Sequence, residues 1–456
     1  MSKLSMFLLA AVGAVSAQAA DVEQLIVRQQ WPWSTDIKVE YRLSGVDTDR
    51  PVDLTLKAFN GETELALPDA AIDGDRYGIT NPTGVLTIDP EAAFGEGRTA
   101  ISDFKVQLSV KNSAANVTEV VYKIFDLLSG ACTDVTRADF YNGKYGAYET
   151  EFSAVGKDFT TELDDVLIWT GVTNDIAYKT SKMVMRKIPA KGKGYTMLSG
   201  TDNAHSVSFT NDYFVSVFEL TEGQWLTIAT NNAKTASTTN PMRFTNERYR
   251  YQRPINGSFH AQMRGYLLWP KGGHEEINAN SVLKAFRTRL GTDAIDLPTE
   301  ALWEYAARAG VWDGNRLPSG KPVAGSSAAD YKAICRYRFN AASQPYADGL
   351  SPQDCDPSDG TNIVGSYAPN AWGLYDVLGN VAEWCLDANS ADVTPFTGPD
   401  PWGPPYDEAW GLGYSVSRVY RGGSYINSGF GLNQRGADLQ TYTWSYIGFR
   451  LCLTVY

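Results

Sequence analysis

The sequence contains very little histidine. Only three histidines occur in 456 residues, His205, His260 and His274. No two of them are close enough along the chain to form a metal-ligand pair on one helix or hairpin. Imidazole is a principal ligand of protein-bound zinc and iron. The sequence therefore argues against a histidine-ligated zinc or iron centre, unless its ligands converge from distant segments.

Positive charge is also scarce. Lys and Arg together number 40 against 52 Asp and Glu, which gives a formal net charge of -12. Nucleic acids and anionic membrane surfaces are bound through clustered Lys and Arg side chains. We therefore expect neither class of partner. The chain also lacks the HExxH, GxSxG and phosphate-loop motifs, so metalloprotease, serine hydrolase and nucleotide-binding functions have no support.

Long apolar runs are missing beyond the N-terminus. Residues 1–20 contain Lys3, an apolar run from Met6 to Val15, and small residues around Ala17 and Ala19. This order is typical of a secretory signal peptide. No later run approaches the roughly 20 apolar residues that a membrane helix needs. We predict a secreted protein, extracellular or periplasmic, with no membrane span.

Cysteine is sparse but not absent. The five cysteines are Cys132, Cys335, Cys355, Cys385 and Cys452. In an exported chain they allow two disulfides and leave at least one thiol. Cys335 and Cys355 flank a loop rich in Pro, Asp and Gly, which makes them the first candidate pair. The sequence leaves the connectivity open.

The N-terminal part of the mature chain is rich in strand-forming segments. Residues 21–125 contain short stretches enriched in Val, Ile, Leu and Tyr, separated by Gly, Pro, Asp and Asn. Short strands at this spacing indicate an all-β sandwich of immunoglobulin or fibronectin type. No catalytic cluster occurs here, so we expect a spacer or docking module. Residues 126–181 have a weaker pattern and are interpreted as a connector that packs along one of the domains, with some strand or helix that the sequence does not place.

Three helices are expected further along the chain. Thr221 and Gln224 have the spacing of a capping box. Asn278 or Asn280 is the expected cap of a second helix, and Thr299 caps a third that ends near Gly310.

The segment GLYDVLGNVAEWC, residues 373–385, has no helical or strand periodicity, so specific local contacts should hold it. Asp376 and Glu383 flank a Leu-Gly-Asn turn in this segment. Together with backbone carbonyls they could ligate a hard cation such as calcium. An equally good interpretation is that both acids accept hydrogen bonds from amides of the turn.

Seven further segments accompany this one in a fixed order. They are KMVMRKIPA (182–190), FELTEGQW (218–225), NPMRFTN (240–246), LPTEALWEYAARAG (297–310), VGSYAPNAWGLYD (364–376), RVYRGGSY (418–425) and IGFRLCL (447–453). Together these segments resemble the formylglycine-generating enzyme family, also called the sulfatase-modifying factor family, over roughly 270 residues. The resemblance implies an α+β domain with a C-type-lectin-like fold over residues 182–456.

The resemblance also implies a metal site. Asp376, Gly379, Val381 and Glu383 stand at the positions of one of the family's calcium sites, where the two acids offer side chains and the other two residues offer carbonyls. All four are chemically compatible with calcium. A structural calcium ion is therefore the expected cofactor.

The family's redox chemistry is not expected. Its enzymes oxidise a sulfatase cysteine with copper and oxygen, using two cysteines that follow the RGGS motif. Those positions are occupied here by Asn427 and Leu432, which offer no thiolate for copper. Ser424 matches the family's active-site serine. If a groove persists, its candidate residues are Ser424, Asn427, Leu432 and Arg435.

Two function classes follow from these observations. The preferred one is a pseudoenzyme that binds a protein, peptide or glycan, because aromatic and amide side chains between RGGSY and IGFR suit recognition. These side chains belong to Asn427, Ser428, Phe430, Asn433, Gln434, Tyr442, Trp444 and Tyr446. On a strand, Tyr442, Trp444 and Tyr446 would share one face. The alternative is an oxidoreductase of the same family, acting on a sulfatase cysteine or another substrate through a divergent metal site.

Overall fold

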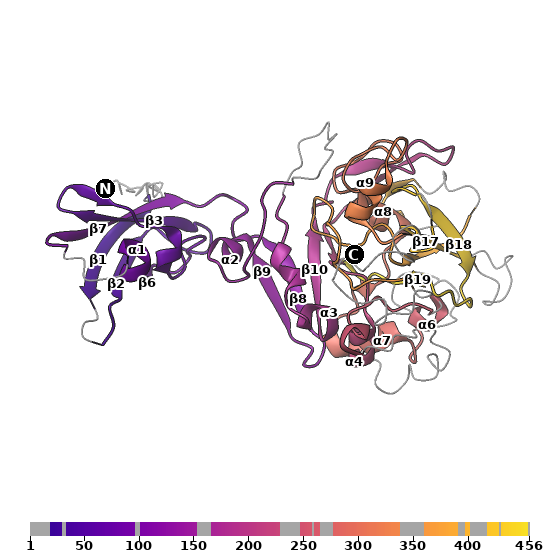
Figure 1. Cartoon of the computed structure of the whole chain (residues 1–456), viewed down its shortest axis with the longest axis horizontal. Coiled ribbons are helices and arrows are strands. Elements are labelled where there is room, and N and C mark those ends of the chain that lie inside the picture. Colours follow the sequence, from indigo (N-terminus) through magenta and orange to yellow (C-terminus); the bar gives the residue numbers. More distant parts are fainter. Residues whose placement is uncertain are drawn as a thin grey trace, which may run out of the picture. The chain divides into compact units, whose positions relative to one another are not determined.

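The computed structural model describes residues 19–29, 33–95, 101–152, 166–228, 247–257, 260–264, 277–337, 360–390, 397–401, 417–427 and 430–454. The chain divides into two compact units (Figure 1). The first comprises Met1–Glu119 and Thr136–Lys144, and the second comprises Val120–Val135 and Tyr145–Tyr456. Each unit is described by itself below.

The described residues of the first unit form two antiparallel sheets. One has the order β1-β2-β6-β5, with β1 Asp21–Gln29, β2 Ile37–Ser44, β5 Ile72–Asp73 and β6 Thr83–Ile88. The other has the order β4-β3-β7, with β3 Val52–Asn60, β4 Thr63–Leu65 and β7 Phe104–Asn112. Alternate residues of β2 are buried, and they join residues of β3 and β6 in one apolar core. This period of two is the one that the sequence predicts for a sandwich.

The first unit also contains the short helices α1 and η1, and the helix α2 from a segment that follows β9 (Cys132–Thr136) in the sequence. Asp89 caps α1 (Pro90–Phe94) through the backbone amides of Glu91 and Ala92, and η1 spans Asp69–Ala71. Helix α2 (Arg137–Tyr141) begins with a capping box between Thr136 and Asp139. The chain therefore returns to the first unit after two strands in the second one.

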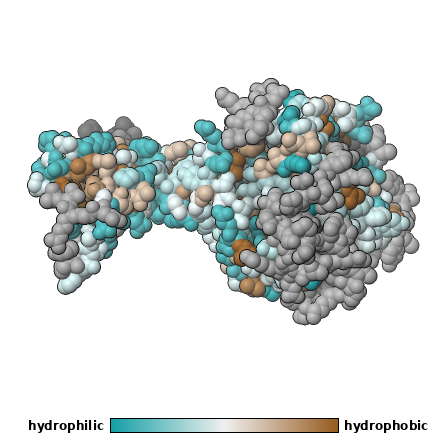
Figure 2. All heavy atoms as spheres, in the orientation of Figure 1, coloured by the Kyte–Doolittle hydropathy of each residue, from teal (hydrophilic) through white to brown (hydrophobic). Residues whose placement is uncertain are grey.

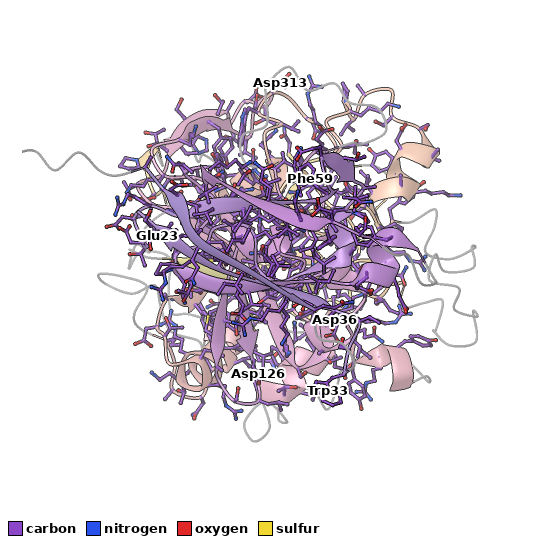
Figure 3. The ribbon with its side chains drawn as sticks, turned by 90° about the vertical axis from the view of Figure 1, so that its left-hand side faces the viewer. Glu23, Trp33, Asp36, Phe59, Asp126 and Asp313 are labelled. Carbon is purple, nitrogen blue, oxygen red and sulfur yellow. The ribbon has the colours of Figure 1, made fainter. Side chains whose placement is uncertain are left out.

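The described surface of the first unit combines polar residues with a few exposed hydrophobic ones, namely Val27, Trp33 and Val85. Trp33 follows β1 and is 90% exposed. In Figure 3, Trp33 and Asp36 mark one end of the β1–β2 ribbon, and Glu23 marks the other. Figure 2 shows a small group of hydrophobic residues among hydrophilic ones on the face of this unit that is turned to the viewer.

The described residues of the second unit form three sheets. The largest has the order β14-β20-β13-β10-β8-β9, from β8 Val120–Asp126, β9 Cys132–Thr136, β10 Lys182–Ile188, β13 Tyr213–Ser216, β14 Ile295–Asp296 and β20 Cys452–Thr454. The second has the order β18-β17-β15-β19, from β15 Ala382–Ala388, β17 Ser417–Arg421, β18 Arg435–Leu439 and β19 Ile447–Gly448. The third has the order β11-β12-β16, from β11 Gly194–Met197, β12 His205–Ser208 and β16 Gly398–Pro399.

The predicted boundary at residue 125 and the predicted connector differ from the structure. Strand β8 pairs with β10 from Lys182↔Asp126 to Arg186↔Tyr122, so it belongs to the second unit. Part of the expected connector is also ordered there, as η2 (Thr170–Thr173) and α3 (Ala177–Thr180). The physical reason is that Val121, Ile124 and Phe125 are buried in the larger domain, whereas their sequence pattern is that of any sandwich strand.

Short helices lie between these strands. They are α4 Glu222–Ile228, α5 Glu247–Arg250, α6 His260–Arg264, α7 Val282–Leu290, α8 Glu300–Arg308 and α9 Ala328–Ile334. The predicted capping box is present, because Thr221 and Gln224 exchange backbone-to-side-chain hydrogen bonds of 3.1 Å. Thr299 caps α8, as expected. The cap of α7 is Ser281 and neither Asn278 nor Asn280, because Ser281 Oγ accepts from the Lys284 amide.

The whole arrangement is α+β, as the sequence predicts, with many strands and few helices. Among the described residues, none of the helices has the length and apolar character needed to cross a membrane.

Candidate functional site

The segment from Asp376 to Glu383 forms a buried turn followed by β15. Asp376 and Asn380 both have a positive φ, of 55° and 52°. Gly379 has a φ of 78°, and a Cβ there would lie 2.3 Å from the Arg336 carbonyl oxygen. The turn therefore requires glycine at this position, both for its backbone angle and for the close approach of Arg336.

Asp376 is buried and only partly satisfied. Its Oδ2 accepts a 2.7 Å hydrogen bond from the Gly365 amide, whereas its Oδ1 is buried without a hydrogen-bond partner. Burial raises the pKa of Asp376 to about 6, although the Gly365 amide and the Arg450 charge oppose this change. An orphaned carboxylate oxygen in the interior is costly, and a bound cation would relieve that cost.

Glu383 already has strong partners. Both of its oxygens accept from Arg450, at 2.9–3.1 Å, and Oε2 also accepts from Trp303 Nε1 at 2.6 Å. Arg450 in turn donates to the carbonyls of Ser216, Val217 and Tyr375. This ion pair holds the C-terminal segment against β15.

A third carboxyl group, Glu219, lies beside this turn and was not singled out from the sequence. Its oxygens accept from the Val381 amide at 3.0 Å and from Asn380 Nδ2 at 2.6 Å. Burial, followed by the negative charges of Asp376 and Glu383, raises the pKa of Glu219 well above its usual range. The available signal was the position of this acid between Phe218 and Leu220, because an acid within an apolar run is often buried.

The turn therefore has some, but not all, of the free oxygen ligands that a cation would need. Three buried carboxyl groups, Glu219, Asp376 and Glu383, lie close to the Arg450 guanidinium, and the charge of Lys179 also acts on Asp376. Of the two predicted acid ligands, Asp376 offers an unsatisfied oxygen, whereas Glu383 would share its oxygens with Arg450 and Trp303. Across the described ranges, no cluster of three or more His, Cys, Asp or Glu side chains has an arrangement that could hold a metal ion. A calcium site here depends on the carbonyls of Gly379 and Val381 as well.

The residues predicted to line a groove lie in different surroundings. Ser424 is fully buried, and its amide and hydroxyl both donate to Asn427 Oδ1, at 2.7 and 3.0 Å. Leu432 is fully buried in the apolar core. Arg435 lies on β18 and donates to Glu300 and Asn389, both at 2.8 Å. The structure thus brings Ser424 and Asn427 together, and it leaves the side chains of Ser424 and Leu432 without access to solvent.

The buried thiols of the second unit are poor substitutes for the two family cysteines, and Cys132, which also belongs to this unit, is exposed and lies on β9. Cys335, Cys385 and Cys452 are buried, and burial raises the pKa of each thiol well above its usual range. Such thiols stay protonated, and copper binds the thiolate form. Cys355 lies outside the described residues, so the Cys335–Cys355 pairing stays a prediction.

The two described histidines each contact a backbone carbonyl. His205 Nδ1 lies 2.7 Å from the Asn203 oxygen, and His260 Nε2 lies 3.1 Å from the Cys385 oxygen. Burial, together with the charges of Arg418 and Arg264, lowers the pKa of His260 well below its usual range. His274 lies outside the described residues.

Three rings after β18 form a cluster that we call the aromatic platform, consisting of Tyr442, Trp444 and Tyr446. The Trp444 and Tyr446 rings are stacked with centroids 5.5 Å apart, and Tyr442 meets Trp444 edge-on at 6.3 Å. Trp444 Nε1 donates to Asp438 Oδ2 at 2.6 Å, which fixes the indole. Tyr442 is 47% exposed and Trp444 is 38% exposed.

The three rings lie together, although they do not lie on a strand. Residues 440–446 form turns and irregular backbone between β18 and β19. The other residues predicted for this face differ in their environment. Phe430 is buried, Asn433 is held by Arg308 and by the Ser199 carbonyl, and Ser428 lies outside the described residues.

Comparison with known proteins places this domain in a family. Residues 178–455 match the model of the "Sulfatase-modifying factor enzyme 1-like domain". A formylglycine-generating enzyme of Thermomonospora curvata is 38% identical over 134 residues, which cover 28% of this chain and 38% of that protein. Another from Streptomyces coelicolor is 36% identical over 143 residues, covering 28% of this chain and 36% of that protein. The chain thus matches well under half the length of these two enzymes.

Other similarities extend over more of the chain. A protein named chaperone protein LppX, from Paenibacillus barcinonensis, is 25% identical over 235 residues, which cover 48% of this chain and 71% of that protein. Among solved structures, Treponema denticola variable protein 1 aligns with a TM-score of 0.42 and 21% identity, over 60% of this chain and 95% of that one. The family model spans more than half of the residues, and it confirms the resemblance seen in the ordered motifs. The chain belongs to the sulfatase-modifying factor family.

Proposed function

We propose that this protein is an exported binding protein that uses the aromatic platform to contact a protein, peptide or glycan, and that a calcium ion stabilises its second unit. The observation that carries the proposal is the platform itself. It presents two large, partly exposed rings in fixed positions, and such rings give extensive contact at a low cost in conformational entropy.

The surroundings of the two replaced family cysteines support a binding role over catalysis. The Asn427 side chain accepts a hydrogen bond from the Ser424 amide, and the Leu432 side chain is part of the apolar core. The three buried thiols elsewhere in the second unit have raised pKa values. The described residues therefore supply no accessible thiolate pair that could replace the missing one.

Copper chemistry provides a direct test. The purified protein, loaded with copper(I), would be incubated with oxygen and a peptide that carries a sulfatase-type cysteine motif. We expect no formylglycine by mass spectrometry. Formylglycine produced at a rate above that of copper alone would contradict the binding proposal and favour the oxidoreductase alternative.

The contribution of the platform can be measured by substitution. Trp444→Ala removes the central ring, and we expect it to weaken the binding of any array-identified peptide or glycan at least tenfold, as is typical for a buried aromatic contact. Tyr442→Ala should weaken the same binding to a lesser degree. Peptide and glycan arrays would first be screened with the full-length protein. Calorimetry would then measure the affinity of each peptide or glycan that binds.

Trp33→Ala is the matched control, because Trp33 is also an exposed tryptophan but lies in the first unit. Its affinity should equal that of the unsubstituted protein. Circular dichroism and the melting temperature would establish that Trp444→Ala remains folded despite the loss of its bond to Asp438. Binding that Trp444→Ala and Tyr442→Ala leave unchanged would exclude the platform as the contact surface.

Calcium enters the proposal through Asp376. This residue would hold the ion together with Gly379, Val381 and Glu383, as the family resemblance implies. Its orphaned Oδ1 and the excess of carboxyl groups around Arg450 support that assignment. The ion would neutralise buried negative charge and rigidify the turn before β15.

Export is proposed from the apolar N-terminal segment, most of which lies outside the described residues. Detection of a mature N-terminus near residue 21 in the secreted fraction would test it.

A further inference from the structure

The first unit contains a hollow of about 500 Å³ whose lining is mostly polar. Its walls come from Tyr41 of β2, from the segment between β5 and β6, from the start of β6, and from residues 136–144. All of these residues belong to the first unit. The volume lies within the range of roughly 300–1,000 Å³ that is usual for small-ligand pockets.

The returning segment that contains α2 fixes one wall of the hollow. The Asn142 side chain accepts from the amides of Arg76 and Tyr77, at 2.7 and 2.9 Å, and donates to the Tyr77 carbonyl at 3.0 Å. Lys144 bridges Asp75 and Asp139, at 3.1 and 3.2 Å. These bonds join segments more than 60 residues apart in sequence, so the wall is held by specific contacts.

Three residues of the lining keep hydrogen-bonding capacity that the described part of the chain does not use. Within the described residues, the Tyr41 hydroxyl is influenced by burial and by the charge of Asp75 and has no hydrogen bond. Asp75 uses Oδ2 for Lys144, which leaves its second oxygen as an acceptor. Asn81 uses Oδ1 to accept from the amide and hydroxyl of Thr83, which leaves its amide nitrogen as a donor. Together they provide an acceptor, a donor and a group that can do both.

A second hollow, of about 320 Å³, adjoins the first. Tyr41, Thr83, Gly84 and Val85 line both. Gly84 pairs directly with Tyr41 across the β2–β6 ladder, and a Cβ at Gly84 would lie 2.2 Å from the Tyr41 hydroxyl oxygen. The phenol therefore occupies the space that a side chain at position 84 would fill, at the point where the hollows meet.

The charges and polarity of the lining restrict the chemistry of a ligand. Asp75 and Asp139 line the first hollow with Lys144, which both of them engage, and Glu40 and Arg42 line the second, so acidic groups outnumber basic ones and anions such as phosphate are disfavoured. The prevalence of hydroxyl, amide and carboxylate groups disfavours a lipid chain. Burial, followed by the negative charge of Asp75, raises the pKa of Tyr41, so its hydroxyl keeps its proton. Sugar hydroxyls both donate and accept, which matches the three unused groups, and two adjoining hollows accommodate more than one ring.

We propose that these adjoining hollows of the first unit form a binding site for an uncharged oligosaccharide, with the Tyr41 hydroxyl, Asp75 and Asn81 as its hydrogen-bonding groups. This site is separate from the aromatic platform and does not depend on it.

The full-length protein would be tested against a panel of neutral di- and trisaccharides, namely cellobiose, maltose, lactose, chitobiose and their trimers, by saturation-transfer NMR and calorimetry. At least one sugar should bind. Tyr41→Phe removes only the hydroxyl and keeps the ring over Gly84, and we expect its affinity to fall about fivefold to tenfold. Asn81→Asp keeps the acceptor for Thr83 but removes the donor, and it should weaken binding to a similar extent.

Gln107→Glu is the matched control for Asn81→Asp, because it makes the same amide-to-carboxylate change at an exposed position of β7 outside both hollows. It should bind as the unsubstituted protein does. The inference is overturned if no neutral sugar of the panel binds, or if binding survives both Tyr41→Phe and Asn81→Asp. Binding lost only in Trp444→Ala would also overturn it, and would assign the sugar to the platform.

Discussion

Replacing Arg450 with methionine is expected to lower the free energy of unfolding by about 3–5 kcal/mol, because the substitution leaves Glu383 buried and charged without its cation. Arg450 and Glu383 are each about 1% exposed. The same substitution also removes donors from the carbonyls of Ser216, Val217 and Tyr375. Urea denaturation followed by tryptophan fluorescence would measure the change.

Lys321→Met is the matched control in the same unit. Lys321 pairs with Asp330 at 2.7 Å, but its side chain is 34% exposed, so water screens the pair. Its loss should cost less than about 1 kcal/mol. If Arg450→Met were no more destabilising than Lys321→Met, the buried ion pair would not organise this part of the fold. The double variant Arg450→Met, Glu383→Gln should recover part of the loss, because it removes the unpaired charge.

The sequence predicts the start of a helix correctly where one capping side chain determines it. Thr221 with Gln224 and Thr299 are caps in the structure. The cap of α7 was misplaced because Ser281 and the two preceding asparagines are all good caps, and only the tertiary position of Val282 and Leu283 determines where the helix starts. Propensity alone could not choose among them.

The domain boundary required information that is not local. Residues 120–126 are rich in strand-forming Val, Tyr, Ile and Phe, and the sequence offers no sign that their partner is β10 at residues 182–188. Strand pairing depends on which sheet has an open edge, and that is a property of the assembled fold.

At the candidate metal site, too, the sequence predicts local features but not the contacts between distant segments. The motif contains Asp376 and Gly379, which have positive φ in the turn, and Glu383, which lies on the strand that follows it. The motif could not reveal that Glu383 accepts hydrogen bonds from Arg450, which lies 67 residues further along the chain. It also could not reveal that the Val381 amide donates to Glu219, which lies 162 residues earlier. The excess of buried negative charge emerges only when these three segments meet.

That excess leads to the second large effect. In calcium-free buffer at pH 8, Asp376→Asn is expected to stabilise the protein by up to about 3 kcal/mol, because the folded-state pKa of about 6 exceeds the ordinary 3.8 by about two units. Asparagine keeps an acceptor for the Gly365 amide and tolerates the positive φ at this position. It carries no charge to bury.

The sign of the pH dependence follows from the raised pKa. The folded state binds the proton of Asp376 more tightly than the unfolded state, so the contribution of this group is fully present below about pH 3.8 and is lost as the pH rises through about 6. The advantage of Asp376→Asn should therefore grow by roughly 2–3 kcal/mol between pH 4 and pH 8. Asp313→Asn is the control, because Arg316 lowers the pKa of the exposed Asp313, so any small effect should have the opposite trend with pH.

Calcium should cancel most of the stability advantage of Asp376→Asn. An ion bound to the ionised carboxylate stabilises the folded state by about 2.7 kcal/mol when its concentration is 100 times the dissociation constant. Asp376→Asn replaces the charged ligand with a neutral one and should lose most of that gain. Melting temperatures at pH 8 would be compared in EGTA and in millimolar calcium, with Asp313→Asn following the unsubstituted protein. Equal stabilisation of all three proteins would place any bound calcium away from this turn, and a destabilised Asp376→Asn in EGTA would show that the buried carboxylate is not strained.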